Sequence, residues 1–347
     1  GHEPLAPVEL EAEPQVADLR GQVDVLDLGA GGRGRTQLGE RGQRPGPQVG
    51  ERGRVGVRGA RALLRPQDKL LLSDIHLRPT TPPARAESDW YTVQENYLQQ
   101  VKAIAYANDC HVFIAGDLFD DGWRPGRCPP ELISFAIDAF KQIGLHRRVY
   151  AVPGQHDLPN HSYDEIKRSA YWILHQANSI TNMAPEVKYE MPHLDMTVSG
   201  VPWGFEIPRV PYVGPRVRLL LAHKYIWNEV YNPANSEDTD SHVLGVTRHM
   251  LQHFDAAAFG DNHMGFLFNP AKKKLSILNC GRFIPQLANE INYVPTVGIL
   301  YEDGSIVRVP LDASRDQWDH DYIARAIVPE RSEERRVGKE CLRLCRS

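Results

Sequence analysis

The 347-residue sequence lacks several features that would each assign it to a class of protein. It has no run of about 18 apolar residues, so we expect no transmembrane helix and no membrane association. No basic-then-apolar signal peptide opens the chain, and the five cysteines include no C-x-x-C pair. We therefore expect a reduced, cytoplasmic protein without a disulfide framework. The formal net charge of −4 argues against a surface that coats nucleic acid.

Residues 1–66 contain no Lys, Asn, Ser, Ile, Phe, Tyr, Trp, Met or Cys. Without aromatic residues or isoleucine this segment cannot bury much apolar surface, so disorder is expected. Its Gly- and Arg-rich composition leaves two interpretations open. One is an RNA-binding tail; the other, favoured because the missing residues mostly have AT-containing codons, is a GC-rich stretch translated in the wrong frame or strand.

The other end of the chain shows a similar anomaly. The stretch "RSEERRVGKEC", residues 331–341, resembles the translation of a sequencing-library adapter. We therefore treat residues 331–347 as an adapter-derived tail and expect one folded domain at 67–330. In that interpretation the natural chain was cut near Glu330, and the two late cysteines carry no information about the fold.

Within 67–330, apolar runs alternate with amphipathic stretches. Helices are predicted at 91–108 and 131–143, the second with proline before it and Gly144 after it. Strands are predicted at 69–73, 111–115, 147–151, 217–223, 256–260, 274–279, 295–301 and 305–309, the last two joined by the turn "EDGS". This alternation predicts an α/β fold with two packed mixed sheets flanked by helices.

Polar residues follow five of the apolar strands at the point where each strand ends. A single Asp or His in such a place usually caps a turn. Turn capping does not explain why five consecutive strands all end in such residues, so we expect the strand ends to form a ligand site. The residues are Asp74, His76, Asp117, Gln155, His156, His223, Asp261 and His263. They offer carboxylate, imidazole and amide groups without thiolate, which suits Mn²⁺, Fe or Zn²⁺ better than a Cys-type zinc site. Since they are too many for one ion, we expect two ions bridged by a carboxylate, a site suited to phosphoryl displacement.

The five blocks "DIH", "GDLFD", "GQHD", "AH" and "GDNH" resemble, in order, the signature of the calcineurin-like metallophosphoesterases over about residues 69–300. The resemblance implies an α/β/β/α sandwich and a hydroxide bridging two metals as nucleophile. It implies that Asp74, His76 and His263 hold the first ion and that Asp117 bridges. Gln155, His223 and Asp261 would hold the second ion. His156, oriented by Asp157, would act on the phosphate or protonate the leaving oxygen.

Two residues depart from the signature blocks, and both belong to the second ion. Gln155 stands where the family has Asn, and Asp261 where it has the first His of G-H-x-H. The charged oxygen ligand should bias this position toward Mn²⁺ or Mg²⁺. We therefore expect two divalent ions, with Mn²⁺ favoured over Mg²⁺, Fe and Zn²⁺, and interpret the site as retuned and not dead, because no ligand is apolar.

Two segments favour DNA as the substrate. "AGDLFDDGWRPGRCPPELISFAI" and "LNCGRFIPQLANEINYVPTVGILYEDGSI" resemble SbcD-type and phage DNA repair exonuclease subunits. The resemblance predicts a DNA exonuclease or phosphodiesterase that works with an SbcC-like ATPase partner, whose docking helices would follow the present chain. Two alternatives remain open: a phosphatase or phosphodiesterase acting on a protein or small molecule, and an inactive scaffold that binds a partner. The net acidic 67–330 region requires any DNA contact to come from local patches.

Overall fold

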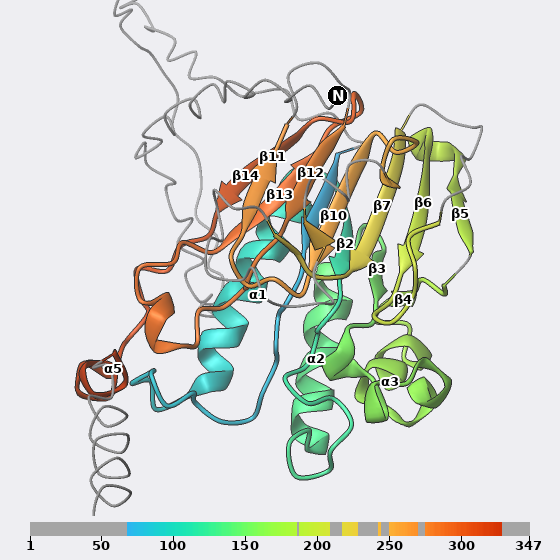
Figure 1. Ribbon diagram of the computed structural model, residues 1–347. Coiled ribbons are helices and arrows are strands. Elements are labelled where there is room, and N and C mark those ends of the chain that lie inside the picture. Colours follow the sequence, from blue (N-terminus) through green and yellow to red (C-terminus); the bar gives the residue numbers. More distant parts are fainter. Residues whose placement is uncertain are drawn as a thin grey trace, which may run out of the picture. The chain divides into compact units, whose positions relative to one another are not determined.

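The computed structural model describes residues 68–185, 187–208, 217–227, 242–243, 250–269 and 275–327. The tails expected at 1–66 and 331–347 lie outside these described residues. Strands and helices alternate in the first half of the described part, and strands dominate the second half (Figure 1). No described helix combines the length and the apolar content that crossing a membrane requires.

The first sheet has six strands in the order β14-β13-β1-β2-β3-β4. Strands β1 to β4 run parallel, whereas β13 is antiparallel to both β1 and β14, so the sheet is mixed. The strands span Lys69–Leu72 (β1), His111–Ala115 (β2), Val149–Val152 (β3), Thr181–Asn182 (β4), Thr296–Leu300 (β13) and Ile306–Pro310 (β14).

The second sheet also has six strands, in the order β11-β12-β10-β7-β6-β5. Its four inner strands are parallel, and an antiparallel strand lies at each edge. The strands span Lys188–Met191 (β5), Met196–Val201 (β6), Val217–His223 (β7), Ala256–Gly260 (β10), Phe266–Phe268 (β11) and Ser276–Asn279 (β12). A separate two-stranded pair joins Ile226–Trp227 (β8) to His242–Val243 (β9).

The apolar strand β1 shows why the sheets stack. Successive side chains point to opposite faces of a strand. Leu70 and Leu72 accordingly pack with the helices, and Leu71 packs with residues of the second sheet such as Leu219 and Leu278. All three leucines of β1 are buried, as expected for a parallel strand covered on both faces.

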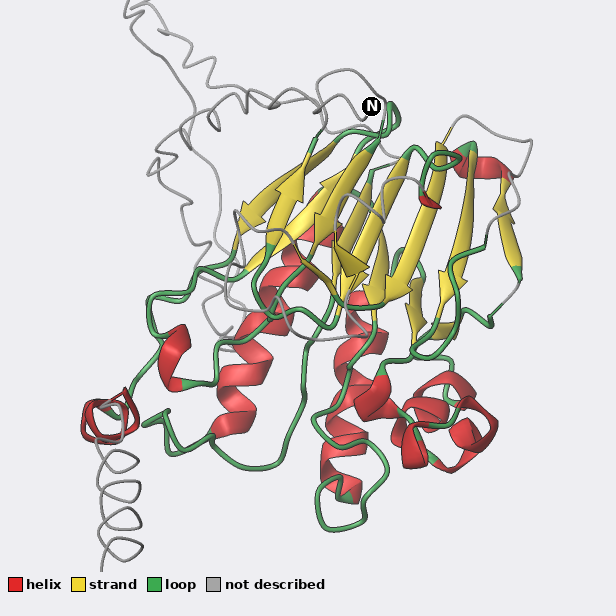
Figure 2. Ribbon diagram, viewed as in Figure 1, coloured by secondary structure: helices red, strands yellow, loops and turns green. Residues whose placement is uncertain are grey.

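Helices cover the outer face of the first sheet, and Figure 2 shows them gathered to one side of the strands. They span Trp90–Ala107 (α1), Pro130–Ile143 (α2) and Ala170–Gln176 (α3). A further helix, α5, spans His320–Ile327 and lies apart from the strands in Figure 1. Asp89 caps α1 by accepting hydrogen bonds from the backbone N–H groups of Tyr91 and Thr92. Short 3₁₀ turns span Gln155–Asp157, Pro159–His161, Tyr163–Arg168, Pro192–Leu194 and Ala288–Glu290.

The predicted α/β fold with two mixed sheets is confirmed. The third strand starts two residues later than the predicted 147–151 and ends at Val152, which places "GQHD" immediately beyond it. Residues 228–241 and 244–249 lie outside the described part of the chain. The described residues Leu251 and Phe254 pack on the outer face of the second sheet with Leu220 and Phe259.

Candidate metal centre

Both sheets deliver polar residues to the same edge. Asp74 and His76 follow β1, Asp117 follows β2, and the turn Gln155–Asp157 follows β3. In the second sheet His223 ends β7, and Asp261 directly follows β10. Because the strands within each set are parallel, their carboxyl ends lie together.

The loops after these strands adopt strained backbone conformations. Nine non-glycine residues have positive φ in the described part, and four of them are Asp74, His76, Asp117 and Asp261. Non-glycine residues rarely adopt this region, and the strain persists only where the surroundings hold it. Backbone hydrogen bonds stabilise these conformations. The N–H of Asp74 donates to the carbonyl of Gly116 (3.0 Å), and the N–H of His76 donates to the carbonyl of Asp117 (3.0 Å).

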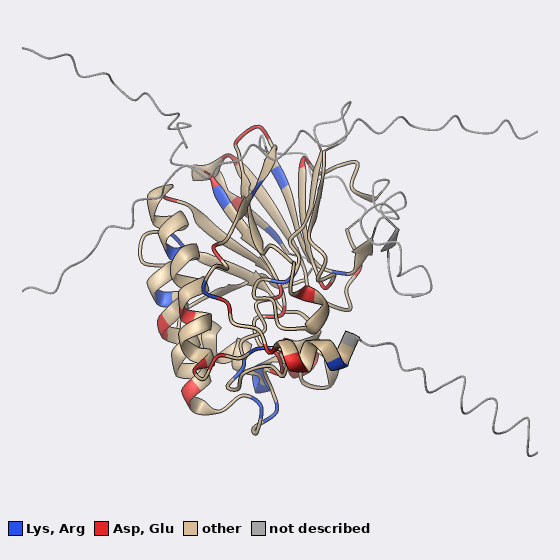
Figure 3. Cartoon of the chain, turned by 90° about the vertical axis from the view of Figure 1, so that its left-hand side faces the viewer, with Lys and Arg blue, Asp and Glu red and all other residues tan. Residues whose placement is uncertain are grey.

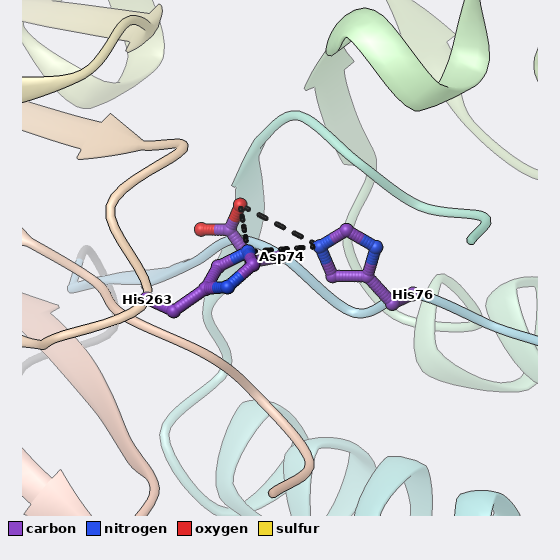
Figure 4. Close-up of side chains that lie close together, drawn as sticks. All are labelled: Asp74, His76 and His263. Atoms are coloured by element: carbon purple, nitrogen blue, oxygen red, sulfur yellow. Dashed lines mark hydrogen bonds and ion pairs between the residues drawn. The ribbon is translucent and has the colours of Figure 1, made fainter. Parts of the chain in front are cut away.

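The first group of side chains consists of Asp74, His76 and His263, which converge in Figure 4. The Nε2 atoms of the two histidines are 3.2 Å apart. Oδ1 of Asp74 lies 4.0 Å from Nε2 of His76 and 3.9 Å from Nε2 of His263. Two ligands that each lie about 2.1 Å from one ion are separated by no more than about 4.2 Å, so all three pairs fit a common ion.

Asp117 lies between the first group and the second. Its Oδ2 atom is 3.7 Å from Nε2 of His76 and 3.3 Å from Nε2 of His223. This oxygen is buried and has no hydrogen-bond partner among the described atoms, whereas Oδ1 accepts a bond from the backbone N–H of His156 (3.0 Å). A buried carboxylate oxygen without a donor is costly unless a cation neutralises it, which is the position expected of a bridging ligand.

The second group contains His223, Gln155 and Asp261. Nδ1 of His223 donates to the carbonyl of Ala115 (2.6 Å), an orientation that leaves Nε2 for an ion. That Nε2 lies 2.7 Å from Oε1 of Gln155, and Nε2 of Gln155 donates to Oδ1 of Asp261 (2.7 Å). Asp261 therefore joins the group through Gln155, while Asp74, Asp117 and His223 offer ligand atoms within 4.8 Å of one another.

The acids of the centre titrate differently. Burial raises the pKa of Asp74 to about 7, although the charge of His223 opposes the shift. Burial would also raise the pKa of Asp117, but His223 and His76 together hold it below its usual value. The carboxylate of Asp117 in turn outweighs burial and raises the pKa of His223 well above 6.5. In the absence of an ion, a charged Asp117–His223 pair therefore forms the middle of the centre.

Arg282 and Glu290 are neighbours of the centre that the sequence did not reveal. The guanidinium NH2 group of Arg282 contacts Nδ1 of His263 at 2.6 Å, and its Nε forms an ion pair with Glu290 at 2.8 Å. Burial and the Arg282 charge lower the pKa of His263 to about 3 and that of His76 well below 6.5. Both imidazoles are thus neutral at pH 7, the form that binds a metal. No spacing rule marks Arg282, which lies within one of the segments that resemble the DNA exonucleases.

Glycines let the strand ends approach these side chains. A Cβ atom on Gly154 would lie 2.0 Å from Oδ1 of Asp117, and one on Gly116 would lie 2.1 Å from Nδ1 of His223. Gly116 also has φ of +89°, which favours glycine. Neither position has room for a larger residue without displacing a residue of the centre.

His156 lies at the edge of the centre, and its ring centroid is 5.1 Å from that of His76. Its Nδ1 atom is 2.8 Å from the carbonyl oxygen of Asp120. A carbonyl only accepts, so Nδ1 carries a proton and Nε2 is left for exchange with a substrate.

The predicted orientation of His156 by Asp157 is wrong. The Asp157 side chain is fully buried and accepts from the backbone N–H groups of Leu118 (3.2 Å), Phe119 (3.1 Å) and Gly154 (3.0 Å). The carboxylate of Asp157 therefore links the loop that follows β2 to the loop that follows β3. The orienting partner of the His156 ring is the carbonyl of Asp120.

Several solved structures are distantly similar. An archaeal phosphodiesterase is 13% identical over 70% of this chain and 99% of its own, with a TM-score of 0.37. A Staphylococcus aureus protein described as a 5′-nucleotidase is 10% identical over 72% and 53%, with a TM-score of 0.40. The Thermus thermophilus sulfate thiohydrolase SoxB is 10% identical over 74% and 59%, with a TM-score of 0.42. TM-scores below 0.5 are too low for any of these likenesses to bear on function.

No curated protein matches the chain. A family model does match, over residues 70–265, a span that contains every strand end described above. That span is more than half of the 347 residues and runs from β1 to beyond His263. The chain belongs to the calcineurin-like phosphoesterase family.

Proposed function

We propose that this phosphoesterase hydrolyses phosphodiester bonds in DNA. The observation that carries the proposal is the position of Asp117. Its Oδ2 lies within ion-pair distance of Nε2 of both His76 and His223, while its Oδ1 accepts a hydrogen bond from the backbone N–H of His156. One carboxylate thus connects both candidate ion positions to the residue suited to proton transfer.

The residues fit the two divalent ions used by the family. Asp74, His76 and His263 would hold the first ion, and Asp117 would be shared. The second ion would be held by His223, Gln155 and Asp261. When bound, divalent ions supply positive charge that polarises a phosphoryl oxygen and acidifies water. The mixture of carboxylate, amide and neutral imidazole groups favours Mn²⁺.

His156 would supply the proton for the departing oxygen. With Nδ1 donating to the carbonyl of Asp120, the imidazolium presents its second N–H at Nε2. As the phosphorus–oxygen bond breaks, this proton passes to the leaving oxygen and the ring becomes neutral. The contact between the backbone N–H of His156 and Asp117 keeps the ring beside the centre throughout.

Two exposed arginines close to the centre support a polynucleotide over a small monoester. The backbone N–H of Gly122 donates to the carbonyl of His156 (2.9 Å), and the loop that follows exposes Arg124, which also pairs with Asp121 at 3.2 Å, and Arg127. Charges elsewhere on the helices are of both signs and interspersed (Figure 3). Phosphate contacts near the centre would therefore come from this loop. The sequence similarity to SbcD-type subunits also supports DNA as substrate and an ATPase as partner.

An assay panel with Mn²⁺ tests the proposal. The substrates are single-stranded DNA, double-stranded DNA, bis(p-nitrophenyl) phosphate and p-nitrophenyl phosphate, with bound metal measured on the same samples. We expect cleavage of DNA and of the diester to exceed that of the monoester. Preference for the monoester would indicate a phosphatase. Bound metal without any hydrolysis would indicate a partner-binding scaffold, and either result would overturn the proposal.

A further inference from the structure

An aromatic pair lies next to the candidate centre and has no part in it. Trp203 follows β6, and its backbone N–H donates to the carbonyl of Pro153 at 3.1 Å. Pro153 directly precedes the Gly154–Gln155–His156 segment, so Trp203 is tied to the loop that carries the proton donor. The carboxyl ends of β6 and β7 point to this same region in Figure 1.

The ring of Trp203 faces His161. Their ring centroids are 5.5 Å apart with planes inclined by 49°, and His161 is exposed while Trp203 is half-buried. A Cβ atom built on the adjacent Gly204 meets nothing within 4 Å, so the backbone beside the indole borders open space. The pair is therefore reachable from solvent.

Core packing does not account for Trp203. Among the described residues, three buried apolar clusters are formed, and Trp203 belongs to none of them. The nearby aromatic residues behave differently, because Tyr163 packs on the helical cluster and Phe205 packs on the outer cluster of the second sheet. Tyr163 and Phe205 also meet edge-to-face at 5.4 Å, so they join the segment after His161 to the segment after Trp203.

The backbone that presents His161 is strained. Asn160 and His161 both have left-handed conformations, with φ of 52° and 55°. Two consecutive non-glycine residues in this region are costly, and such strain is concentrated at binding sites. In this structure the strained residue His161 is the one whose ring meets Trp203.

We propose that Trp203 and His161 form a stacking subsite for a nucleobase whose phosphodiester lies at the metal centre. An indole with an accessible face binds a planar base without requiring a particular sequence. The imidazole adds a second aromatic surface and a polar edge. Lys224 follows His223 and donates to the carbonyl of Phe205 (3.3 Å), which fixes this loop against the centre. This inference rests on the proposed function in one respect, that the phosphodiester of the same nucleotide lies at the metal centre. Stacking of the base on Trp203 can be measured without hydrolysis.

Binding without catalysis is the first test. A fluorescently labelled oligothymidylate and an abasic oligomer of equal length are titrated into the whole chain in EDTA, and anisotropy gives each Kd. We expect the wild-type protein to bind the oligothymidylate more tightly. Trp203→Leu should reduce the ratio of the two Kd values by about 5- to 100-fold, which is the loss of affinity expected when one base no longer stacks on an aromatic ring. Equal affinity of the wild-type protein for both oligomers would overturn the inference without any variant.

A matched control is available in α3. Trp172 is also half-buried and also meets a histidine, His175, at 4.8 Å, but it packs on the helical cluster. Trp172→Leu should leave the base preference at its wild-type value. Trp203→Phe retains a ring and should keep most of the preference. If Trp172→Leu and Trp203→Leu lower the preference equally, the effect is structural and the subsite is wrong.

Hydrolysis separates this inference from the proposed function. Thymidine 5′-(p-nitrophenyl phosphate) and the 5′-(p-nitrophenyl phosphate) of abasic 1,2-dideoxyribose share a leaving group and a sugar and differ in the base. We expect a wild-type preference in kcat/KM for the thymidine ester, reduced in Trp203→Leu and kept in Trp172→Leu. If the wild-type protein hydrolyses neither ester, the proposed function fails while the binding result still decides on stacking. If it hydrolyses both equally well, the subsite fails and the proposed function stands.

Discussion

The side-chain amide of Gln155 donates a 2.7 Å hydrogen bond to the carboxylate of Asp261. These two residues are also the two at which the chain departs from the signature blocks of its family. The departures are therefore in contact, and the other end of the same amide reaches His223 at 2.7 Å. A longer amide and a shorter carboxylate together fill the space around the second ion position.

Restoring imidazole at 261 should change the preferred metal. Asp261→His replaces a hard oxygen by nitrogen, so we expect the Zn²⁺-to-Mn²⁺ affinity ratio to rise by about tenfold or more. Competition titrations monitored by metal analysis give the ratio. Because the two residues touch, Gln155→Asn combined with Asp261→His should differ from the sum of the single variants. An additive result would show that the contact does not tune the site.

His156 should be required for turnover and not for metal. His156→Ala removes the proton donor, so we expect the rate to fall by about 10²- to 10⁴-fold. Metal content should remain at the wild-type level, because neither ion is assigned to this ring, although its ligand atoms lie within 4.8 Å of those of His76 and Asp117. Hydrolysis of bis(p-nitrophenyl) phosphate and metal analysis on the same sample measure both.

His146→Ala serves as the matched control for that experiment, since His146 is exposed and meets Tyr106 through a ring contact of 4.7 Å. It should behave as wild type. Loss of metal together with activity in His156→Ala would assign this histidine to the ion instead.

Asp157 should contribute to stability. The carboxylate of Asp157 accepts three backbone hydrogen bonds with its two oxygens. The side chain of asparagine has one accepting oxygen, and its NH₂ group would lie against a backbone N–H. At least one of the three buried N–H groups would therefore lose its hydrogen bond. We expect Asp157→Asn to lower the free energy of unfolding by about 1–3 kcal/mol. Urea unfolding of the metal-free protein measures this. Asp164→Asn, at an exposed carboxylate, should have no effect. Unchanged stability in Asp157→Asn together with an altered pH–rate profile would restore a catalytic role.

His111 should make the fold sensitive to acid. Burial, helped by the nearby His193 and Arg147, lowers its pKa to about 4, while the unfolded chain titrates near 6.5. The unfolded state therefore binds more protons between these values, so stability is full above about pH 6.5 and falls as the pH drops toward 4. The loss should amount to at most about 3 kcal/mol.

His111→Asn should reduce this loss, because the amide oxygen can still accept from the backbone N–H of Arg148, which now donates to Nδ1 at 3.2 Å. Urea unfolding at several pH values between 7 and 4 gives the slope. His146→Asn, at an exposed position, should retain the wild-type slope. Equal slopes in His111→Asn and the wild type would contradict the assignment.

The candidate centre was predictable to the extent that it follows from strand ends. An apolar strand followed at once by Asp or His can be seen in one sequence, and parallel pairing then brings the ends together. The role of Asp157 could not be seen this way. Its partners Leu118 and Phe119 lie 39 and 38 residues away, while His156 is its immediate neighbour and suggested a false pairing.

The same limit applies to the second sheet. Strand β6 contains Thr197, Ser199 and Gly200, yet all six of its residues are buried, because both faces of this strand are covered: Met196 and Val198 pack toward the first sheet and Val201 packs in the outer cluster. Small polar residues form no apolar run, so the sequence alone does not reveal that this strand is buried. Strand β5 is an edge strand in which Glu190 is exposed and Met191 is buried, and its pattern is equally weak.

The close approach at Gly116 and Gly154 limits how this protein can acquire a different metal preference. Any side chain at either glycine would push on His223 or Asp117, and both are held by further bonds, from His223 to the carbonyl of Ala115 and from the backbone of His156 to Asp117. The distances between ligand positions are therefore nearly invariant under mutation. Selection for activity with a new metal should recover exchanges of the donor atoms, as at Gln155 and Asp261, and should leave both glycines untouched.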